Sequence, residues 1–184
     1  KNGNDISAVT LSDLDGDKED EALVFYRNKA DETLDKKLHI NILAKKNGKW
    51  RSVYDRAADG EDIDRVEICR LGSLEKTEII VGYILPEISE KAFYIYSFSD
   101  DELEVSFENE PYSLFTAADL DRDGQTELLS VSSQSVSKIA SAVVYSPGKE
   151  GTYKSSSIAL DESYVGYKNI GLSKQENGTY IYLD

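Results

Sequence analysis

Two acidic segments, each followed directly by an apolar run, constrain the fold of this chain more than any other feature of its sequence. They read DLDGDKEDEALVFY, from Asp13 to Tyr26, and DLDRDGQTELLSV, from Asp119 to Val131. Each has aspartate at its first, third and fifth positions and glutamate at its ninth, where the apolar run begins. Alternate acidic side chains converge on one centre only if the segment curls tightly. Each segment therefore predicts a curled loop that leads into a β-strand.

This spacing predicts calcium binding, because Ca²⁺ takes about six to eight oxygen ligands at roughly 2.3 to 2.6 Å. The predicted ligands are four carboxylates and the main-chain carbonyl at the seventh position. In the first loop they are Asp13, Asp15, Asp17, Glu19 and Glu21. In the second loop they are Asp119, Asp121, Asp123, Gln125 and Glu127. The spacing thus predicts one or two bound calcium ions.

The glycine positions distinguish the two loops. Gly124 occupies the sixth position of the second loop, where an EF-hand loop needs glycine for its sharp turn, whereas the first loop has Lys18 there and Gly16 earlier. On this ground the second loop is the stronger candidate. The alternative is that the aspartates form solvated turns without metal. A turn without metal, however, gains nothing from three mutually repelling carboxylates within five residues.

Short runs rich in Val, Ile, Tyr and Phe predict an all-β chain, since no stretch shows the periodicity of a helix. The clearest hairpin signal is the turn NGK, Asn47–Lys49, between the predicted strands Leu38–Lys45 and Trp50–Asp55. A pattern of four strands recurs about every fifty residues, which is typical of stacked or radial β repeats. The predicted repeats cover residues 5–56, 63–109, 111–160 and 163–184, the last of them incomplete.

The second repeat lacks the acidic signature. When Leu11–Tyr26 is aligned with Ile68–Tyr83, Glu78 falls on Glu21. The three aspartates of the first loop are replaced by Arg70, Gly72 and Leu74. We therefore expect no metal in this loop. Because the glutamate persists without the aspartates, it is expected to serve strand entry as much as metal binding.

A strand, a DxDxDGxxE-like loop and an apolar strand, repeated about every fifty residues, resemble the FG-GAP or VCBS calcium-loop repeats of integrin-α-like β-propellers. The rhythm covers nearly the whole chain, and two of the four repeats carry the acidic signature. The ninth position holds Glu where the family usually has Asp, and no repeat shows a clear FG…GAP pair.

The resemblance implies a single partial β-propeller domain over residues 1–184, with about three and a half four-stranded antiparallel blades. Such a ring cannot close, because propellers need about four to eight blades, and the final strand, Thr179–Asp184, would keep an open edge. Completion by parent sequence absent from this chain, or by a second copy, is expected. Bacterial members of the family are often exported proteins or lipoproteins. The resemblance thus implies an extracellular or surface-anchored bacterial protein whose signal segment is absent here.

The composition excludes several function classes. The chain has 21 basic and 35 acidic residues and a net charge of −14, which argues against nucleic acid or an anionic membrane as partner. No run approaches the roughly 18 apolar residues of a membrane span. The lone His39 and the lone Cys69 lie in no catalytic, zinc or redox motif, and no phosphate loop occurs.

These observations predict a calcium-stabilised, non-enzymatic scaffold or recognition module, with a protein or glycan as ligand. One alternative is the propeller part of a carbohydrate-binding or carbohydrate-active protein, since carboxylates and tyrosines are plentiful. Another is a β-sandwich with acidic turns and no metal. The sequence does not single out ligand-binding residues.

Overall fold

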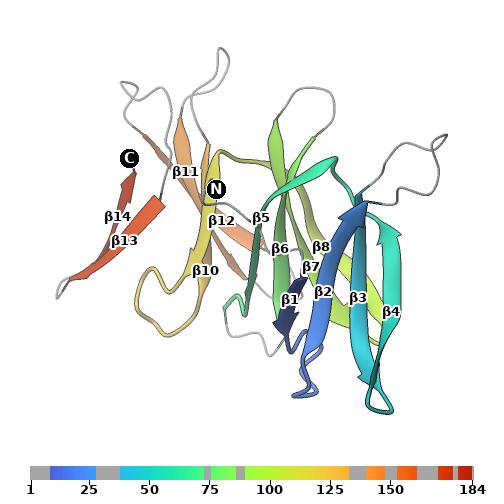
Figure 1. Cartoon of the computed structure of the whole chain (residues 1–184). Helices are drawn as coiled ribbons and strands as arrows, with labels where there is room; N and C mark the ends of the chain where they lie inside the picture. Colours follow the sequence, from blue (N-terminus) through green and yellow to red (C-terminus); the bar gives the residue numbers. More distant parts are fainter. Residues whose placement is uncertain are drawn as a thin grey trace, which may run out of the picture. The chain divides into compact units, whose positions relative to one another are not determined.

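The computed structural model describes residues 9–27, 38–72, 76–85, 90–132, 140–147, 153–160, 170–175 and 178–183. In these ranges the chain forms fourteen β-strands and no helix (Figure 1). The predicted all-β class is therefore confirmed. The described residues accordingly contain no helix long and apolar enough to cross a membrane.

The strands form three four-stranded sheets and one two-stranded sheet. The first sheet contains β1 (Val9–Ser12), β2 (Glu21–Arg27), β3 (Leu38–Lys46) and β4 (Lys49–Ala57). The second contains β5 (Asp62–Cys69), β6 (Glu78–Ile84), β7 (Lys91–Ser99) and β8 (Glu102–Pro111). The third contains β9 (Leu114–Ala118), β10 (Glu127–Ser132), β11 (Ser141–Pro147) and β12 (Tyr153–Ala159). The fourth contains β13 (Ile170–Gln175) and β14 (Gly178–Leu183). In every sheet, strands that follow one another in sequence are neighbours.

The sheets can be compared with the predicted repeats, whose bounds as blades of one domain remain a prediction. One four-stranded sheet lies in each of the ranges 5–56, 63–109 and 111–160, apart from one or two residues at strand ends, and the range 163–184 holds β13 and β14. Within these predicted repeats, residues 5–8, 28–37, 73–75, 86–89, 133–139, 148–152, 163–169, 176–177 and 184 lie outside the described residues. The strand count and order of each repeat are therefore those that the sequence predicts.

The chain divides into two compact units. The first comprises Lys1–Ile68 and Lys76–Asn109, and the second comprises Cys69–Glu75 and Glu110–Asp184. The first and second sheets thus belong to the first unit, and the third and fourth sheets to the second. A ring of blades within a single propeller domain remains a prediction.

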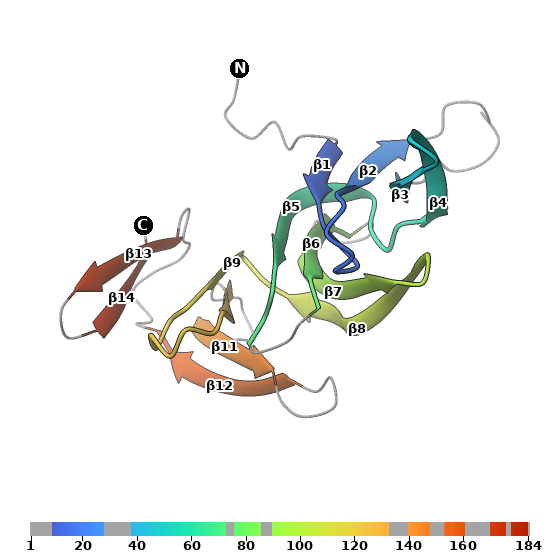
Figure 2. The same ribbon diagram turned by 90° about the horizontal axis from the view of Figure 1, so that it is seen from below.

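The core of the first unit lies between its two sheets (Figure 2). Leu23 and Phe25 of β2 lie opposite Ile42 and Ile40 of β3, so the four side chains share one face of the first sheet. They pack with the buried residues Ile79, Val81, Tyr83, Tyr96 and Phe98 of the second sheet. Leu38, Ile40 and Ile42 are all at most 4% exposed, so these alternate residues of β3 form one buried apolar face.

A smaller core lies in the second unit. Leu129, Val131 and Ala142 are buried there on the third sheet, and Leu114, Leu120, Val144 and Leu160 pack against them. Leu120 belongs to the second acidic segment. The apolar residue that follows the first aspartate therefore helps to fix that segment to the sheet.

The turn between β3 and β4 is the predicted Asn-Gly hairpin. Asn47 and Gly48 have φ angles of 56° and 72°, the left-handed conformation that a type I′ turn requires at both central residues. Lys46 pairs with Lys49 on either side of the turn, and a β-bulge follows between the pairs of Leu43 and Ile42. Together, the turn and the bulge fix which side chains of β3 and β4 lie opposite one another.

Candidate metal sites

The two acidic segments form loops at the same position in two sheets. The first acidic loop (residues 13–20) joins β1 to β2, and the pair Ser12 and Glu21 closes it. The second acidic loop (residues 119–126) joins β9 to β10, and the pair Ala118 and Glu127 closes it. The predicted arrangement of a loop followed by a strand is therefore confirmed in both repeats.

Each loop brings three carboxylates together. Asp13, Asp15 and Asp17 each place one oxygen within 4.8 Å of the others. In the second loop the corresponding group consists of Asp119, Asp121 and Glu127. Carboxylate oxygens gathered in this way suit a hard divalent cation.

Hydrogen bonds to the main chain shape the first acidic loop. Asp13 Oδ1 accepts from the N–H of Gly16 at 2.7 Å. Asp15 Oδ1 accepts from the N–H of Asp17 at 3.0 Å, and Asp17 Oδ1 accepts from the N–H of Glu19 at 2.7 Å. The aspartates thus close successive local turns, the ability for which Asp is favoured in loops.

The second acidic loop repeats this pattern position by position. Asp119 Oδ1 accepts from the N–H of Arg122 at 2.7 Å. Asp121 Oδ1 accepts from the N–H of Asp123 at 3.1 Å, and Asp123 Oδ1 accepts from the N–H of Gln125 at 2.8 Å. The two loops therefore have the same hydrogen-bonded conformation, although most of their residues that are not acidic differ.

The ninth-position glutamates are buried and hold the start of each loop. Glu21 and Glu127 are 3% and 6% exposed. Glu21 Oε2 accepts from the N–H of Leu14 at 2.9 Å, and Glu127 Oε2 accepts from the N–H of Leu120 at 2.8 Å. Glu127 also belongs to the second carboxylate group, whereas Glu21 is not a member of the first.

The negative charges of the aspartates contribute to raising the pKa of both ninth-position glutamates. Burial raises the pKa of Glu21, and the negative charges of Asp15, Asp17 and Asp13 raise it further, against the hydrogen bond from Leu14. The pKa of Glu127 is raised in the same way, by burial first and then by the aspartates of its own loop. A bound cation would relieve this repulsion in both loops.

Glu78 occupies the equivalent position in the second sheet. It is the first residue of β6, as Glu21 is of β2 and Glu127 is of β10. It is 4% exposed, so burial of this glutamate does not depend on a neighbouring group of aspartates. Of the residues that replace the aspartates, Leu74 lies outside the described residues. The expectation that this loop binds no metal remains a prediction.

Both loops need two residues in the left-handed conformation. In the first loop Gly16 has a φ of 87° and Lys18 a φ of 75°. In the second loop Arg122 has a φ of 69° and Gly124 a φ of 89°. Each loop therefore has glycine at one of the two positions and a strained residue at the other. The position of glycine in the sequence ranks the second loop above the first as a calcium site. Because the two backbones are equivalent, glycine position gives no reason to prefer the second loop.

Relief of this strain gives a first testable prediction. Lys18→Gly is expected to stabilise the metal-free protein by about 0.5 to 1 kcal/mol relative to Lys18→Ala, because alanine keeps the strain that glycine avoids. Both variants lose the same charge, so their difference isolates the backbone. Urea unfolding in the presence of EGTA measures it. Equal midpoints for the two variants would contradict the assigned conformation.

Glu19 and Gln125 lie at the seventh position, as predicted. Their N–H groups donate to the fifth-position aspartates, and the side-chain amide of Gln125 also donates to Asp123 Oδ2 at 2.7 Å. Coordination by their main-chain carbonyls remains a prediction.

Thr77 is a contact of the first loop that the sequence reasoning missed. Its hydroxyl donates to the main-chain carbonyl of Asp13 at 3.0 Å, and the residue is 6% exposed. The contact joins the first loop to the residue before β6, within the first unit. The available signal was a threonine directly before the strand-entry glutamate in two repeats, Thr77 and Thr126.

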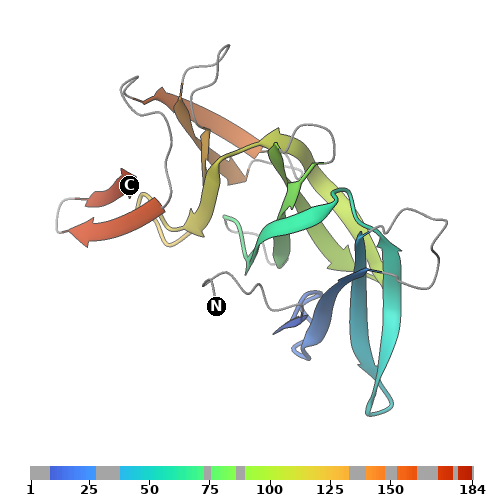
Figure 3. The same cartoon turned by 45° about the horizontal axis from the view of Figure 1, so that its top comes forward.

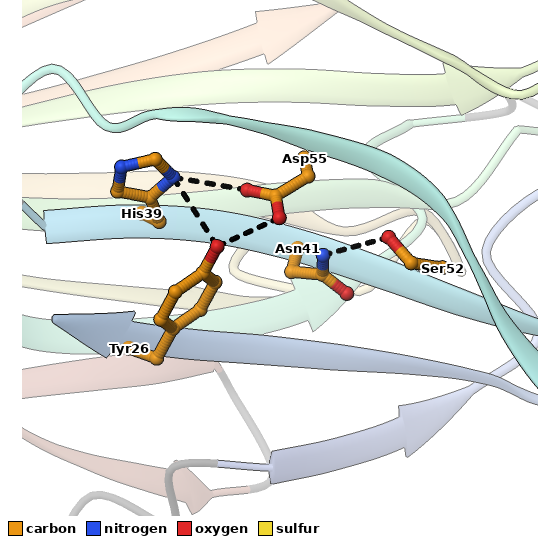
Figure 4. Close-up of polar contacts among 5 residues, drawn as sticks. All are labelled: Tyr26, His39, Asn41, Ser52 and Asp55. Atoms are coloured by element: carbon orange, nitrogen blue, oxygen red, sulfur yellow. Dashed lines mark hydrogen bonds and ion pairs between the residues drawn. The ribbon is translucent and has the colours of Figure 1, made fainter. Parts of the chain in front are cut away.

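A second missed feature is a polar cluster on the first sheet (Figure 4). The Tyr26 hydroxyl donates to Asp55 Oδ2 at 2.7 Å, and His39 Nδ1 lies 2.9 Å from Asp55 Oδ1. Next to them, Asn41 Nδ2 donates to Ser52 Oγ at 2.8 Å. Burial alone would raise the pKa of Asp55, but hydrogen bonds from Tyr26, His39 and Asn41 outweigh it and lower the pKa. The lone histidine is therefore part of a cross-strand network, which no local sequence motif signals.

The resemblance to the FG-GAP and VCBS repeats was drawn from the sequence pattern and remains a prediction. Comparisons of the chain with protein-family models, with curated proteins and with solved structures found no match.

Proposed function

We propose that both acidic loops bind Ca²⁺ and that the ions stabilise a non-enzymatic β-sheet scaffold. One observation carries this proposal: two loops of different sequence adopt the same hydrogen-bonded conformation and each gathers three carboxylates within 4.8 Å. Without a cation, such crowding adds repulsion in both places. A shared ligand explains why the same arrangement occurs twice.

The donor set favours calcium over other metals. The predicted ligands are carboxylate and carbonyl oxygens, which suit Ca²⁺ and Mg²⁺, whereas zinc sites in proteins use nitrogen and sulfur extensively. Mg²⁺ requires near-ideal octahedral geometry and keeps several waters. A curled loop that offers several carboxylates matches the larger and more flexible coordination of Ca²⁺.

A structural role agrees with the position of the loops. Each closes the end of an antiparallel strand pair, and Asp15, Asp17 and Asp121 are exposed to solvent. At affinities of about 10⁻⁴ to 10⁻³ M and roughly 1 mM calcium, each ion would add about 0.4 to 1.4 kcal/mol of stability. Such affinities are useful where calcium is abundant. The proposal therefore includes an extracellular or surface-anchored location and a protein or glycan ligand.

The experiment is a thermal and urea unfolding series with EGTA or with added calcium. Calcium at about 10 mM is expected to raise the free energy of unfolding by about 1.4 to 2.7 kcal/mol per occupied site. Asp121→Ala is expected to remove the part of this calcium-dependent stabilisation that the second loop supplies. Glu104→Ala, which removes an exposed acid of β8, is expected to keep the whole of it. A parent protein that unfolds identically in EGTA and in calcium would refute the proposal.

A further inference from the structure

The hairpin between β3 and β4 carries an unusual concentration of positive charge. Its residues 45–51 read KKNGKWR and are called the basic hairpin below. Lys45, Lys46, Lys49 and Arg51 lie within seven residues of a chain that has a net charge of −14. All seven residues are exposed. The hairpin is thus a local exception to an acidic molecule.

An exposed tryptophan lies among these cations. Trp50 is 44% exposed, and it is the only tryptophan of the chain. It pairs across the hairpin with Lys45, whose Nζ lies 5.1 Å from the centre of the indole ring. Ala44 is 8% exposed and faces the core. Because successive side chains of a strand point to opposite faces, Lys45 and its cross-strand partner Trp50 lie on the other face. Core packing does not account for this tryptophan.

The basic hairpin and the first acidic loop lie at the same end of the first sheet (Figures 1 and 3). The strand pairing requires this, because Ser12 pairs with Glu21, Ala22 with Leu43, and Lys46 with Lys49. The loop contributes the acidic residues Asp13, Asp15, Asp17, Glu19 and Asp20. A flat surface that meets the hairpin end-on would also meet these carboxylates.

We propose that this end of the first sheet docks on an anionic phospholipid surface when calcium occupies the first acidic loop. This rests on the proposed function, since the bound ion offsets two of the five negative charges of the loop. Tryptophan prefers the headgroup level of a membrane, and lysine extends its ammonium towards phosphate while its stem covers apolar surface. The exposed indole and the cations of the basic hairpin supply this combination, with Lys46 Nζ also lying 3.5 Å from Asp101 Oδ1.

The same residues fit a sugar or a nucleic acid less well than a lipid surface. Stacking of a sugar on the indole would compete with Lys45, whose ammonium already lies over the ring. A nucleic acid would extend beyond the hairpin along a chain with 35 acidic residues. A lipid surface instead contacts only the end of the first sheet that carries the basic hairpin. Charges further away than the Debye length of about 8 Å contribute little at physiological ionic strength. The net charge of −14 therefore argues against this contact less than the sequence alone suggests.

The sole tryptophan provides the measurement. Its fluorescence is recorded as vesicles of equal parts phosphatidylglycerol and phosphatidylcholine are added, in about 1 mM calcium and about 150 mM salt. A blue shift is expected with these vesicles and not with phosphatidylcholine alone or in EGTA. The double variant Lys45→Gln/Lys49→Gln is expected to partition about 25-fold more weakly, about fivefold for each cation. Lys154→Gln, which removes an exposed cation of β12, is expected to partition like the parent.

Calorimetric titration with calcium, in the absence of lipid, separates the two proposals. Calcium uptake without any vesicle-induced shift would overturn the lipid proposal and leave the calcium proposal standing. An equal shift with neutral vesicles, or an unchanged affinity in the double variant, would also overturn the lipid proposal. Absence of calcium uptake would overturn the calcium proposal itself, and with it the calcium-dependent docking.

Discussion

Gly60→Ala is expected to lower the free energy of unfolding by about 3 kcal/mol, the upper end of the usual range for overpacking. A Cβ atom at this position would lie 2.4 Å from Tyr83 Cβ and 2.7 Å from Tyr83 Cγ. Tyr83 is fully buried in the core of the first unit. The neighbouring Tyr96 hydroxyl donates to Asp59 Oδ2 at 2.6 Å, and its oxygen lies 3.2 Å from the Tyr83 hydroxyl oxygen. The ring of Tyr83 is therefore held from two sides and cannot move away cheaply.

Gly48→Ala is the matched control for this substitution. Nothing lies within 4 Å of a Cβ at Gly48, but its φ of 72° is strained for alanine. It is expected to cost only about 1 kcal/mol. Urea unfolding of both variants, with a melting temperature lowered by on the order of 10 °C for Gly60→Ala, measures the difference. Equal costs for the two variants would mean that Gly60 does not pack against Tyr83 as described.

Glu127→Gln is expected to change stability in opposite directions with and without calcium. In calcium, the variant lacks a charged ligand of the second loop, and its affinity there is expected to fall about tenfold or more. Without metal, glutamine keeps an acceptor for the Leu120 N–H and lacks the charge that burial and the nearby aspartates disfavour. The metal-free variant is therefore expected to be more stable than the parent at neutral pH.

The pH dependence of the metal-free parent follows from the same pKa. The pKa of Glu127 is raised in the folded protein above its ordinary value of 4.5. Its contribution to stability is therefore fully present below the unfolded pKa and is lost as pH rises through the folded pKa. The gain from Glu127→Gln should appear over that pH interval and vanish in more acidic solution. Unfolding in EGTA at a series of pH values measures it.

Glu78→Gln provides the control for the metal effect. Glu78 has the same buried position at the start of its strand, in a sheet whose loop lacks the aspartate pattern. Its substitution is expected to leave calcium affinity unchanged. If Glu78→Gln weakened calcium binding as much as Glu127→Gln does, the second loop would not be the site.

The strands were predictable because their signals are local. Strand β2 (Glu21–Arg27) begins at the glutamate where the sequence places the start of the apolar run, and the Asn47-Gly48 turn has the expected conformation. Alternating apolar residues and turn formers act over a few positions, so a single sequence is sufficient to recognise them. The placement of the sheets relative to one another depends on contacts between distant residues, which such signals do not contain.

The candidate sites were predictable only in part. The spacing of the aspartates identified both loops, since every contact among them lies within a few residues. The hydrogen bond from Thr77 to Asp13 joins two repeats, so the threonine that precedes the strand-entry glutamate marks one partner at most and does not identify the other. The network of Tyr26, His39 and Asp55 depends on the register of three strands. A shift of one residue in that register would move these side chains to opposite faces.

The role of Gly60 had no sequence signal at all, because Gly60 lies between β4 and β5 while its partner Tyr83 lies on β6. The basic hairpin is recognisable in the sequence as four cations within seven residues, but the sequence pattern by itself predicts only a turn there. Its exposure, and its position beside the first acidic loop, follow from the antiparallel pairing of β1 to β4. The net charge of the whole chain, −14, does not indicate that the basic hairpin is locally positive.

The hydrogen bonds of the two acidic loops bear on how quickly and how steeply the protein would respond to calcium. The carboxylates already hold main-chain N–H groups, including those of Gly16 and Arg122, so most of each loop is shaped before an ion arrives. Uptake should then require dehydration of the ion and little rearrangement of the protein. Such loops would fill gradually with calcium concentration, as in a constitutive stabilising module, rather than trigger a large opening of the kind by which calcium sensors expose a binding groove.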